Sequence, residues 1–248
     1  MKRIIGYILL SFVCLTVGAQ TKSQADELYK KEKYADAAQV YEKILKNEGV
    51  AAEVYYNLGN CYYKMDEIPH AVLNYERALL LSPGDDDIRA NLVLARSKTI
   101  DKTTLASEMF FVTWWRALVN SMSVHAWVIL AIGSFILMLI GILVYFFVPV
   151  VTVRKVGVYG AFVMLFVVFI SNIAAYSQNE LIENRMTAIV MAPAVTVKSS
   201  PAINSTDLFV IHEGTKVEIL DNQMKGWREV KFEEGKQGWV PKEAIEEI

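Results

Sequence analysis

Fixed charges are missing from two long stretches of this 248-residue chain. No Asp, Glu, Lys or Arg occurs in residues 117–153 or in residues 156–179, although the sequence on either side is rich in charge. Apolar runs of this length are rare in soluble domains, and they are long enough to cross a hydrocarbon core of about 30 Å. The gaps in charge therefore divide the chain into a soluble part, a membrane part and a second soluble part.

Cysteine and histidine are also scarce, with two and three copies. Cys14 lies in the first apolar run, and we interpret Cys61 as a small buried residue of a helix. His70, His125 and His212 lie in three separate segments and lack the spacing of a metal site. There is no glycine-rich phosphate loop and no nucleophile with its base in one segment. We therefore predict no catalytic, metal-binding or cofactor-binding residues, and a protein that is not an enzyme.

The chain has no excess of positive charge. Residues 20–104 contain 12 basic and 14 acidic side chains, and residues 186–248 contain 7 and 10. A protein that binds nucleic acid needs a basic surface to neutralise phosphates. We therefore do not expect nucleic acid among the partners.

The N-terminus has the pattern of an export signal. Lys2 and Arg3 precede the apolar residues 4–17, and small residues follow up to Ala19. A charged start, an apolar core and a small-residue exit are typical of a secretory signal peptide. We predict a signal peptide at residues 1–19, and an uncleaved anchor is the alternative.

Residues 20–100 repeat themselves with a period of 34 residues. The period pairs Tyr29 with Tyr63, Ala37 with Ala71 and Tyr41 with Tyr75. It resembles the tetratricopeptide repeat, whose units are pairs of helices. The second copy carries the family pattern at Tyr55, Leu58, Gly59, Tyr62, Ala71, Tyr75, Ala78 and Pro83.

The repeat region divides into two repeats at residues 25–49 and 59–83 and a capping helix at 86–97. Gly59 and Ala71 are small, as expected where paired helices approach closely. Such arrays usually need about three repeats to stand alone. We therefore expect this one to lean on a partner or on the membrane.

The resemblance implies that a protein or peptide binds along the concave face lined by the first helix of each pair. The candidate binding residues on that face are Asn57, Asn60, Tyr63, Lys64 and Asn91. Each of them could instead be an ordinary solvated helix position.

Some members of this repeat family grip a C-terminal carboxylate with a fixed set of Lys, Asn and Arg. Lys22 and Asn57 match that set, whereas Asp26, Asp87 and Asn91 stand at its other positions. We therefore predict no carboxylate clamp.

The charge-free stretches predict two transmembrane helices, at residues 125–148 and 156–176. The loop between them, 149–155, contains Arg154 and Lys155. Basic residues in a short loop mark the cytoplasmic side, so both soluble domains are expected on the outer face. Neither span contains a fixed charge, which argues against a transporter.

Aromatic side chains gather before the first span. Phe110, Phe111, Trp114 and Trp115 lie next to Arg116. Aromatic rings and basic groups favour the headgroup level of a bilayer. We predict that residues 101–124 form an interfacial segment, and a plain linker is the alternative.

Residues 186–248 change to the short period of β-strands. Five runs rich in β-branched and aromatic residues are separated by turn signals, which predicts a small barrel. The runs cover residues 189–190, 195–198, 208–211, 217–220 and 228–232. Residues 197–201, 212–217, 226–227 and 238–241 resemble the bacterial SH3-like (SH3b) domain.

That resemblance implies binding of peptides or of cell-wall peptide stems. Trp227 and Trp239 are the candidate ligand-binding aromatics of the tail. In so small a barrel, tryptophans more often complete the core, so this alternative stays open.

The predicted fold class is a multidomain membrane protein with helical repeats, a two-helix transmembrane hairpin and a C-terminal all-β SH3-like barrel. This order of parts resembles the BatE-type proteins of bacterial aerotolerance (Bat) operons. The resemblance implies work in an envelope complex with von Willebrand A-domain Bat proteins and a MoxR-type ATPase, in support of oxidative-stress tolerance. The sequence favours a scaffold on the periplasmic face of the inner membrane, with protein and lipid-bilayer contacts. A tether whose SH3-like tail binds peptidoglycan is the alternative.

Overall fold

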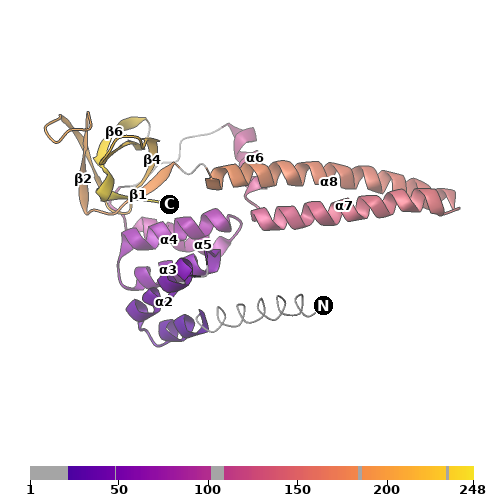
Figure 1. Cartoon of the computed structure of the whole chain (residues 1–248), viewed down its shortest axis with the longest axis horizontal. Helices are drawn as coiled ribbons and strands as arrows, with labels where there is room; N and C mark the ends of the chain where they lie inside the picture. The colour runs from indigo at the N-terminus through magenta and orange to yellow at the C-terminus, as the bar shows by residue number, and fades with distance from the viewer. Residues whose placement is uncertain (1–21, 48, 102–108, 184–185, 233–234) are drawn as a thin grey trace, which may run out of the picture. The chain divides into compact units, whose positions relative to one another are not determined.

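The computed structural model describes residues 22–47, 49–101, 109–183, 186–232 and 235–248. Helical repeats, two long apolar helices and an antiparallel β-sheet follow one another along the chain, which confirms the predicted fold class (Figure 1). The repeats and the sheet form one compact unit, and the apolar helices belong to a second. The predicted signal peptide at 1–19 and residues 102–108 of the predicted interfacial segment lie outside the described residues.

The repeat region of the first unit begins with helical residues 22–30 and continues through four further helices. They are α2 (Tyr34–Asn47), α3 (Ala52–Lys64), α4 (Ile68–Leu81) and α5 (Asp86–Ser97). The second pair, α3 and α4, begins at Ala52, earlier than the predicted repeat boundary at residue 59. The difference arises because Gly59 lies within α3, where a neighbouring helix approaches, and does not mark its start.

The small residues of the second repeat lie where two helices touch. A Cβ atom on Gly59 would come within 2.7 Å of the Tyr75 ring, and Ala71 is fully buried. Tyr41 and Tyr75, which are one period apart, are each 1% exposed. The 34-residue period therefore reports equivalent packing positions in successive helix pairs.

Helix α5 has a well-formed N-terminus. Asp85 is its N-cap, and its carboxylate accepts hydrogen bonds from the backbone N–H groups of Asp87 (3.0 Å) and Ile88 (3.1 Å). Such a cap satisfies backbone donors that have no partner within the helix. Asp86 and Asp87 add negative charge to the first turn, where the helix dipole favours it.

The C-terminal domain is a seven-stranded antiparallel sheet with the order β3-β2-β6-β5-β4-β1-β7. Its buried core is made largely of Val and Ile from alternate strand positions. The strands are β1 (Thr187–Val190), β2 (Ala194–Lys198), β3 (Asp207–His212), β4 (Lys216–Asp221), β5 (Trp227–Phe232), β6 (Lys236–Pro241) and β7 (Ile245–Glu247).

Two strands, β6 and β7, were absent from the five predicted runs. Strand β6 opens with Lys236 and Gln237 and contains Gly238, a composition that resembles a turn. Gly238 is required there, because a Cβ atom would meet Val197 at 2.6 Å and the Lys198 carbonyl oxygen at 2.7 Å. The close approach of β2 thus requires a glycine in β6, and glycine is a residue type that a sequence pattern assigns to turns.

The end of the repeat region packs against the β-sheet within the first unit. One buried cluster joins Leu73 and Tyr75 of α4 and Leu92 of α5 to Ile189 of β1 and the C-terminal Ile248. All five side chains are at most 7% exposed. The short array therefore leans on the chain's own C-terminal domain, and neither a partner nor the membrane is needed to cover this surface.

Polar contacts surround that apolar junction. Arg77 of α4 contacts Glu246 at 3.1 Å and donates to the Glu247 carbonyl oxygen at 2.6 Å. Asp101, beyond α5, accepts hydrogen bonds from the His212 backbone (2.7 Å) and the Thr215 hydroxyl (2.8 Å). The repeats and the sheet are thus joined by specific charge pairing as well as by apolar burial.

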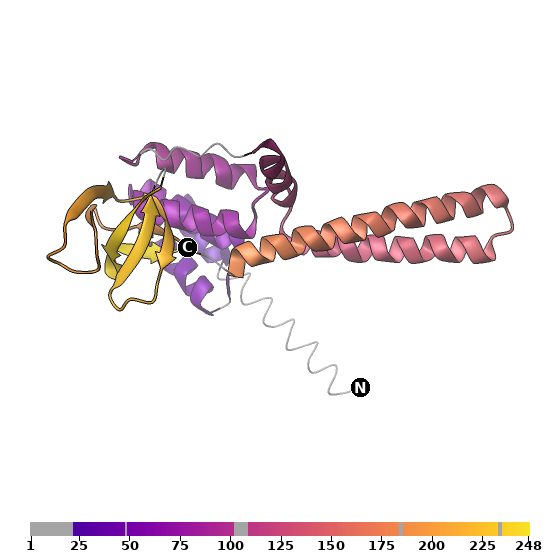
Figure 2. The same cartoon turned by 90° about the horizontal axis from the view of Figure 1, so that it is seen from above.

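The second unit contains α6 (Phe110–Val119), α7 (Val124–Phe147) and α8 (Val151–Glu183). The last two are long and apolar enough to cross a membrane, and they lie side by side as a hairpin (Figures 1 and 2). A Cβ atom on Gly141 would lie 2.6 Å from the Gly157 carbonyl oxygen. Small residues of this kind let two helix backbones approach closely in lipid.

Helix α8 is longer than the span predicted at residues 156–176. It starts at Val151, so Arg154 and Lys155, expected in a loop at 149–155, lie near its beginning. Pro149 disfavours a helical conformation in the residue before it, so it ends α7 but does not prevent a new helix from starting at Val151. Arg154 and Lys155 are good helix formers and can lie within that helix. The helix also continues past Tyr176 to Glu183. Charge therefore marks the apolar limits of the span and not the ends of the helix.

Candidate functional site

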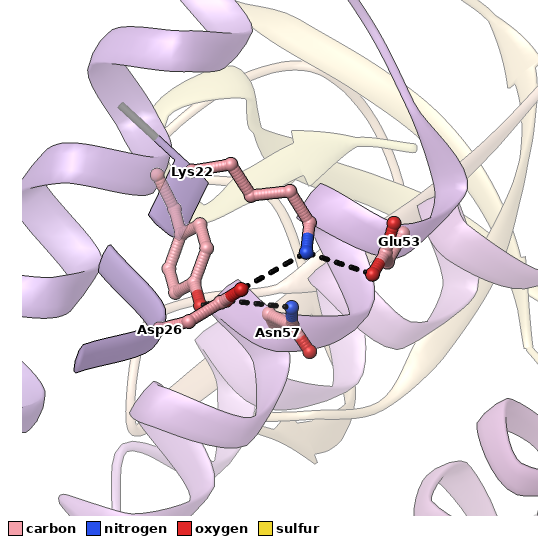
Figure 3. A network of polar contacts seen from close by, with 5 residues as sticks. Lys22, Asp26, Glu53 and Asn57 are labelled. Atoms are coloured by element: carbon pink, nitrogen blue, oxygen red, sulfur yellow. Dashed lines mark hydrogen bonds and ion pairs between the residues drawn. The ribbon is translucent and has the colours of Figure 1, made fainter. Parts of the chain in front are cut away.

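The inner face of the repeats is the predicted concave face, with Asn57, Asn60, Tyr63, Lys64 and Asn91. It begins with a network of charged and polar side chains. Lys22 contacts Asp26 at 3.0 Å and Glu53 of α3 at 2.8 Å (Figure 3). The opposite side of the Asp26 carboxylate accepts hydrogen bonds from the Tyr41 hydroxyl and from Asn57, the latter at 3.5 Å. Three helices therefore converge on one aspartate.

The charges in this network stabilise one another. Hydrogen bonding to Glu53 is the main cause of a raised pKa for Lys22. Burial alone would raise the pKa of Asp26, but hydrogen bonds from Tyr41 and Lys22 lower it below its usual value. Lys22 stays positive and Asp26 stays negative at neutral pH. Because Lys22 already faces two carboxylates of the chain, a ligand carboxylate would have to displace one of them.

A second network follows along the same inner face. The side-chain oxygen of Asn60 accepts hydrogen bonds from the Tyr75 hydroxyl (2.7 Å) and from the Asn91 amide (3.0 Å). The Asn91 amide also lies 3.0 Å from the Tyr56 hydroxyl. Asn60 and Asn91 are only partly exposed. Their amide groups thus hold α3, α4 and α5 together.

The predicted binding residues fall into two groups. The structure brings Asn60 and Asn91 into direct contact and joins Asn57 to the Asp26 network. Tyr63 and Lys64 lie outside these networks: Lys98 sits over the Tyr63 ring at 4.5 Å, and Lys64 is exposed in the last turn of α3.

Sequence reasoning did not select Asp26, Glu53 or Tyr56 as site residues. The sequence did give a reason to consider Asp26, because it stands where the carboxylate-binding members of the repeat family have a different residue. Glu53 and Tyr56 carried none, because each acquires its role only through contacts with other helices: Glu53 pairs with Lys22, and Tyr56 meets Asn91.

The β-domain has a groove of its own. A cavity of about 570 Å³ lies between β2, β5 and the segment after β6. Its lining includes Trp227, Ile203 and Pro241 as apolar surfaces and Lys198 and Glu243 as charged ones. An apolar floor with a few charged groups is typical of a ligand-binding groove.

The two predicted aromatics of the tail do not act together. Trp227 lines the groove, whereas Trp239 does not and instead pairs through β6 with Glu229 of β5 and Lys198 of β2. Both tryptophans are partly exposed, and neither belongs to the buried core of the sheet.

Reactive groups are few in the part of the chain that the structure describes. No group of three or more His, Cys, Asp or Glu side chains there could hold a metal ion. Cys61 is fully buried, and burial is the main cause that raises the pKa of its thiol to about 12. A thiol in that state is a poor nucleophile at neutral pH. The described residues therefore offer binding surfaces and no evident reaction centre.

Comparison with known families matches the two soluble parts separately. Residues 52–85 match the family model of the tetratricopeptide repeat, and residues 193–246 match that of the bacterial SH3 domain. No curated protein matches the chain significantly. Both matched families are interaction modules, the first typical of protein–protein contacts and the second of cell-wall binding.

Proposed function

We propose that the chain is a membrane-anchored, non-enzymatic scaffold that binds a protein partner along the inner face of its repeats. The observation that supports this most directly is the row of polar side chains, linked in two networks, that runs from Lys22 through Asn57 and Asn60 to Asn91. It combines charged groups, amides and tyrosine rings on a firmly packed helical frame. Side chains held in this way lose little entropy when they contact a partner.

The proposed location is the periplasmic face of a bacterial inner membrane. Two helices with the length and hydropathy of membrane spans support the anchoring. Arg154 and Lys155 lie at the hairpin end that would face the cytoplasm under the positive-inside rule. The resemblance to BatE-type proteins adds von Willebrand A-domain Bat proteins as candidate partners, within a complex linked to oxidative-stress tolerance.

Co-purification from detergent, with partners identified by mass spectrometry, tests the scaffold. The test variant replaces Asn57 and Lys64 with Ala, which removes two polar groups of α3. The matched control replaces Asn47 and Lys43 of α2 with Ala. Both are exposed, but α2 is the second helix of its repeat and does not line the predicted binding face. Lost hydrogen bonds to a partner cost about 0.5–1.5 kcal/mol each, and more where charge is involved. The test variant should lose partners that the control keeps; equal recovery from both would contradict the proposal.

A second candidate function is binding of peptidoglycan by the β-domain. The groove beside Trp227 supports it, since an apolar surface lies there next to the Glu243 carboxylate and to Lys198, whose ammonium already pairs with Asp207 and would be shared with a peptide carboxylate. Retention of the protein on purified cell wall, and its loss on Trp227→Ala, would support this function over the first.

A further inference from the structure

A second cavity lies at the end of the apolar hairpin where α6 packs. It measures about 390 Å³. Helix α6 and the residue after it contribute Trp115, Arg116 and Asn120, among others, and α8 contributes Ser177 and Glu180. The cavity therefore combines a cation, an anion, two neutral polar groups and an aromatic surface.

Helix α6 is held firmly against the hairpin. Val119 at its end packs with Trp127 of α7 and Ala174 of α8 in one buried cluster. The Trp127 indole N–H donates to the Val119 carbonyl oxygen at 3.0 Å, and the buried Gln178 amide donates to the Met122 carbonyl oxygen at 3.0 Å. The position of the cavity walls is thus set by packing and by hydrogen bonds.

The opposite face of α6 is apolar and open. Phe110 is 82% exposed, Phe111 56% and Trp114 62%. The same unit exposes apolar side chains along α7 and α8, such as Ile129 at 70% and Phe166 at 66%. If α7 and α8 lie in a bilayer, one lipid environment covers both surfaces, and α6 lies at the level of the headgroups.

We propose that this cavity binds the headgroup of a phospholipid that carries a primary ammonium, as in phosphatidylethanolamine. Arg116 presents a planar guanidinium that suits a phosphate. Glu180 presents a carboxylate for the ammonium, and Ser177 and Asn120 offer further hydrogen bonds. Trp115 and the apolar lining meet the glycerol and the first acyl carbons. The inference rests on the membrane anchoring proposed above.

The charge pattern discriminates among common lipids. A primary ammonium donates hydrogen bonds to Glu180, whereas the quaternary ammonium of phosphatidylcholine has no N–H to donate. Phosphatidylglycerol has no cation, so its headgroup would leave Glu180 unpaired. Because Arg116 and Glu180 are both exposed side chains, solvent screens their contribution. A preference of about three- to tenfold for phosphatidylethanolamine is therefore expected, and a larger one is not.

The test uses the full-length protein in lipid nanodiscs that contain equal parts of the three lipids. Native mass spectrometry after release into detergent counts the lipids that stay bound. Glu180→Gln should reduce retention of phosphatidylethanolamine to the level of phosphatidylcholine, and Arg116→Gln should weaken retention of all three. Lys155→Gln is the control, because it removes a positive charge near the other end of the hairpin. Soluble phosphoethanolamine at millimolar concentration should not displace the lipid, since it lacks the acyl chains.

The outcomes separate the two proposals. A protein that does not co-elute with nanodiscs at all has no membrane anchor, and the anchoring proposal fails together with the headgroup site. Insertion with equal retention of the three lipids, or with no effect of Glu180→Gln, overturns the headgroup site alone. Displacement by soluble phosphoethanolamine would show a small-molecule site and overturn the assignment to lipid.

Discussion

Glu76 of α4 lies between two cations, one from the repeats and one from the β-sheet. Lys216 of β4 contacts one of its oxygens at 2.8 Å, and Arg96 of α5 contacts the other. The Glu76 side chain is only 7% exposed, so removal of either partner would leave a buried carboxylate with one contact fewer. Glu76, in the second helix of the second repeat, therefore also connects this repeat to the C-terminal domain.

This contact predicts an energetic link between the repeats and the β-domain. A double-mutant cycle of Glu76→Gln and Lys216→Met should give a coupling energy of about 1 kcal/mol or more, because Glu76 is buried. The Lys231–Glu218 pair within the sheet is the control: its side chains are 45% and 52% exposed, and its coupling should stay below about 0.5 kcal/mol. Urea unfolding of the full-length protein in detergent measures both cycles. A coupling below about 0.5 kcal/mol for the Glu76–Lys216 pair, no larger than that of the control, would contradict the energetic link between the two domains.

Close packing within the second repeat gives a stability prediction. Ala71 is fully buried, so Ala71→Leu should overpack the helix pair and cost about 1–3 kcal/mol of unfolding free energy. Ala90→Leu adds the same atoms at an exposed position of α5 and should cost less than about 0.5 kcal/mol. The full chain has to be used, because a fragment ending near residue 104 would expose the cluster that Leu73 and Leu92 form with Ile189 and Ile248. If the two variants unfold at the same denaturant concentration, the assignment of the repeat core is wrong.

The repeat fold was accessible from sequence because its rule is periodic. Tyr41 and Tyr75 recur at 34 residues, and both are buried at equivalent places. The support of the array by the β-domain was not accessible. Ile189 and Ile248 look like ordinary strand and terminal residues, and only folding brings them to α4 and α5.

The candidate site was predicted in part for a similar reason. A helical face can be predicted from spacing, so Asn57, Asn60 and Asn91 could be placed on one face, and their binding of a partner stays a prediction. The internal hydrogen bond from the Tyr75 hydroxyl to Asn60 joins different helices. Spacing along one helix says nothing about such a bond. The groove beside Trp227 likewise depends on which strands meet, and strand β6 was not predicted at all.

The charge distribution predicts the topology. Single cysteines at Lys64 and Lys236 should react with a membrane-impermeant thiol reagent in intact spheroplasts, because both positions are exposed and are expected outside the cytoplasm. A cysteine at Thr152, near the start of α8, should react only after the membrane is opened. The fully buried Cys61 should add little background. Labelling at residue 152 alone in intact cells would reverse the proposed orientation.

Acid should weaken the junction between the repeats and the β-domain. Burial alone would raise the pKa of Asp101, but hydrogen bonds from the His212 backbone and Thr215 lower it below its usual value. A carboxyl whose pKa is lower in the folded state stabilises the fold above its unfolded pKa, near pH 4, and loses that contribution as the pH falls through the folded pKa.

Unfolding free energy measured from pH 6 to pH 3 checks this. Asp101→Asn should be less stable than the wild type at pH 6 and should show a flatter decline in acid. Asp86→Asn is the control, since Asp86 is 89% exposed and its side chain faces Arg89 of the same helix. If the unfolding free energy falls with pH equally steeply in the wild type and in Asp101→Asn, Asp101 does not link stability to pH.

The last prediction separates the two candidate functions, and the structure decides which variants can do so. Alanine at Asn60 would leave the Tyr75 hydroxyl without its acceptor, and deletion from Met186 onward would uncover the cluster around Leu73. Neither change tests binding alone. Asn57→Ala with Lys64→Ala alters the inner face, whereas Trp227→Ala alters the groove of the β-domain and leaves the buried core of the sheet intact.

Each variant is measured for co-purified membrane proteins and for retention on purified peptidoglycan. A scaffold predicts that the inner-face variant binds its protein partners about five- to 150-fold more weakly, because two polar contacts contribute about 1–3 kcal/mol together. The same reading predicts that Trp227→Ala keeps those partners. Trp227→Ala could instead abolish retention on peptidoglycan while the inner-face variant keeps every protein partner. The β-domain would then carry the binding function. The repeats would then serve as the frame against which Ile189 and Ile248 pack, and the scaffold proposal would be wrong.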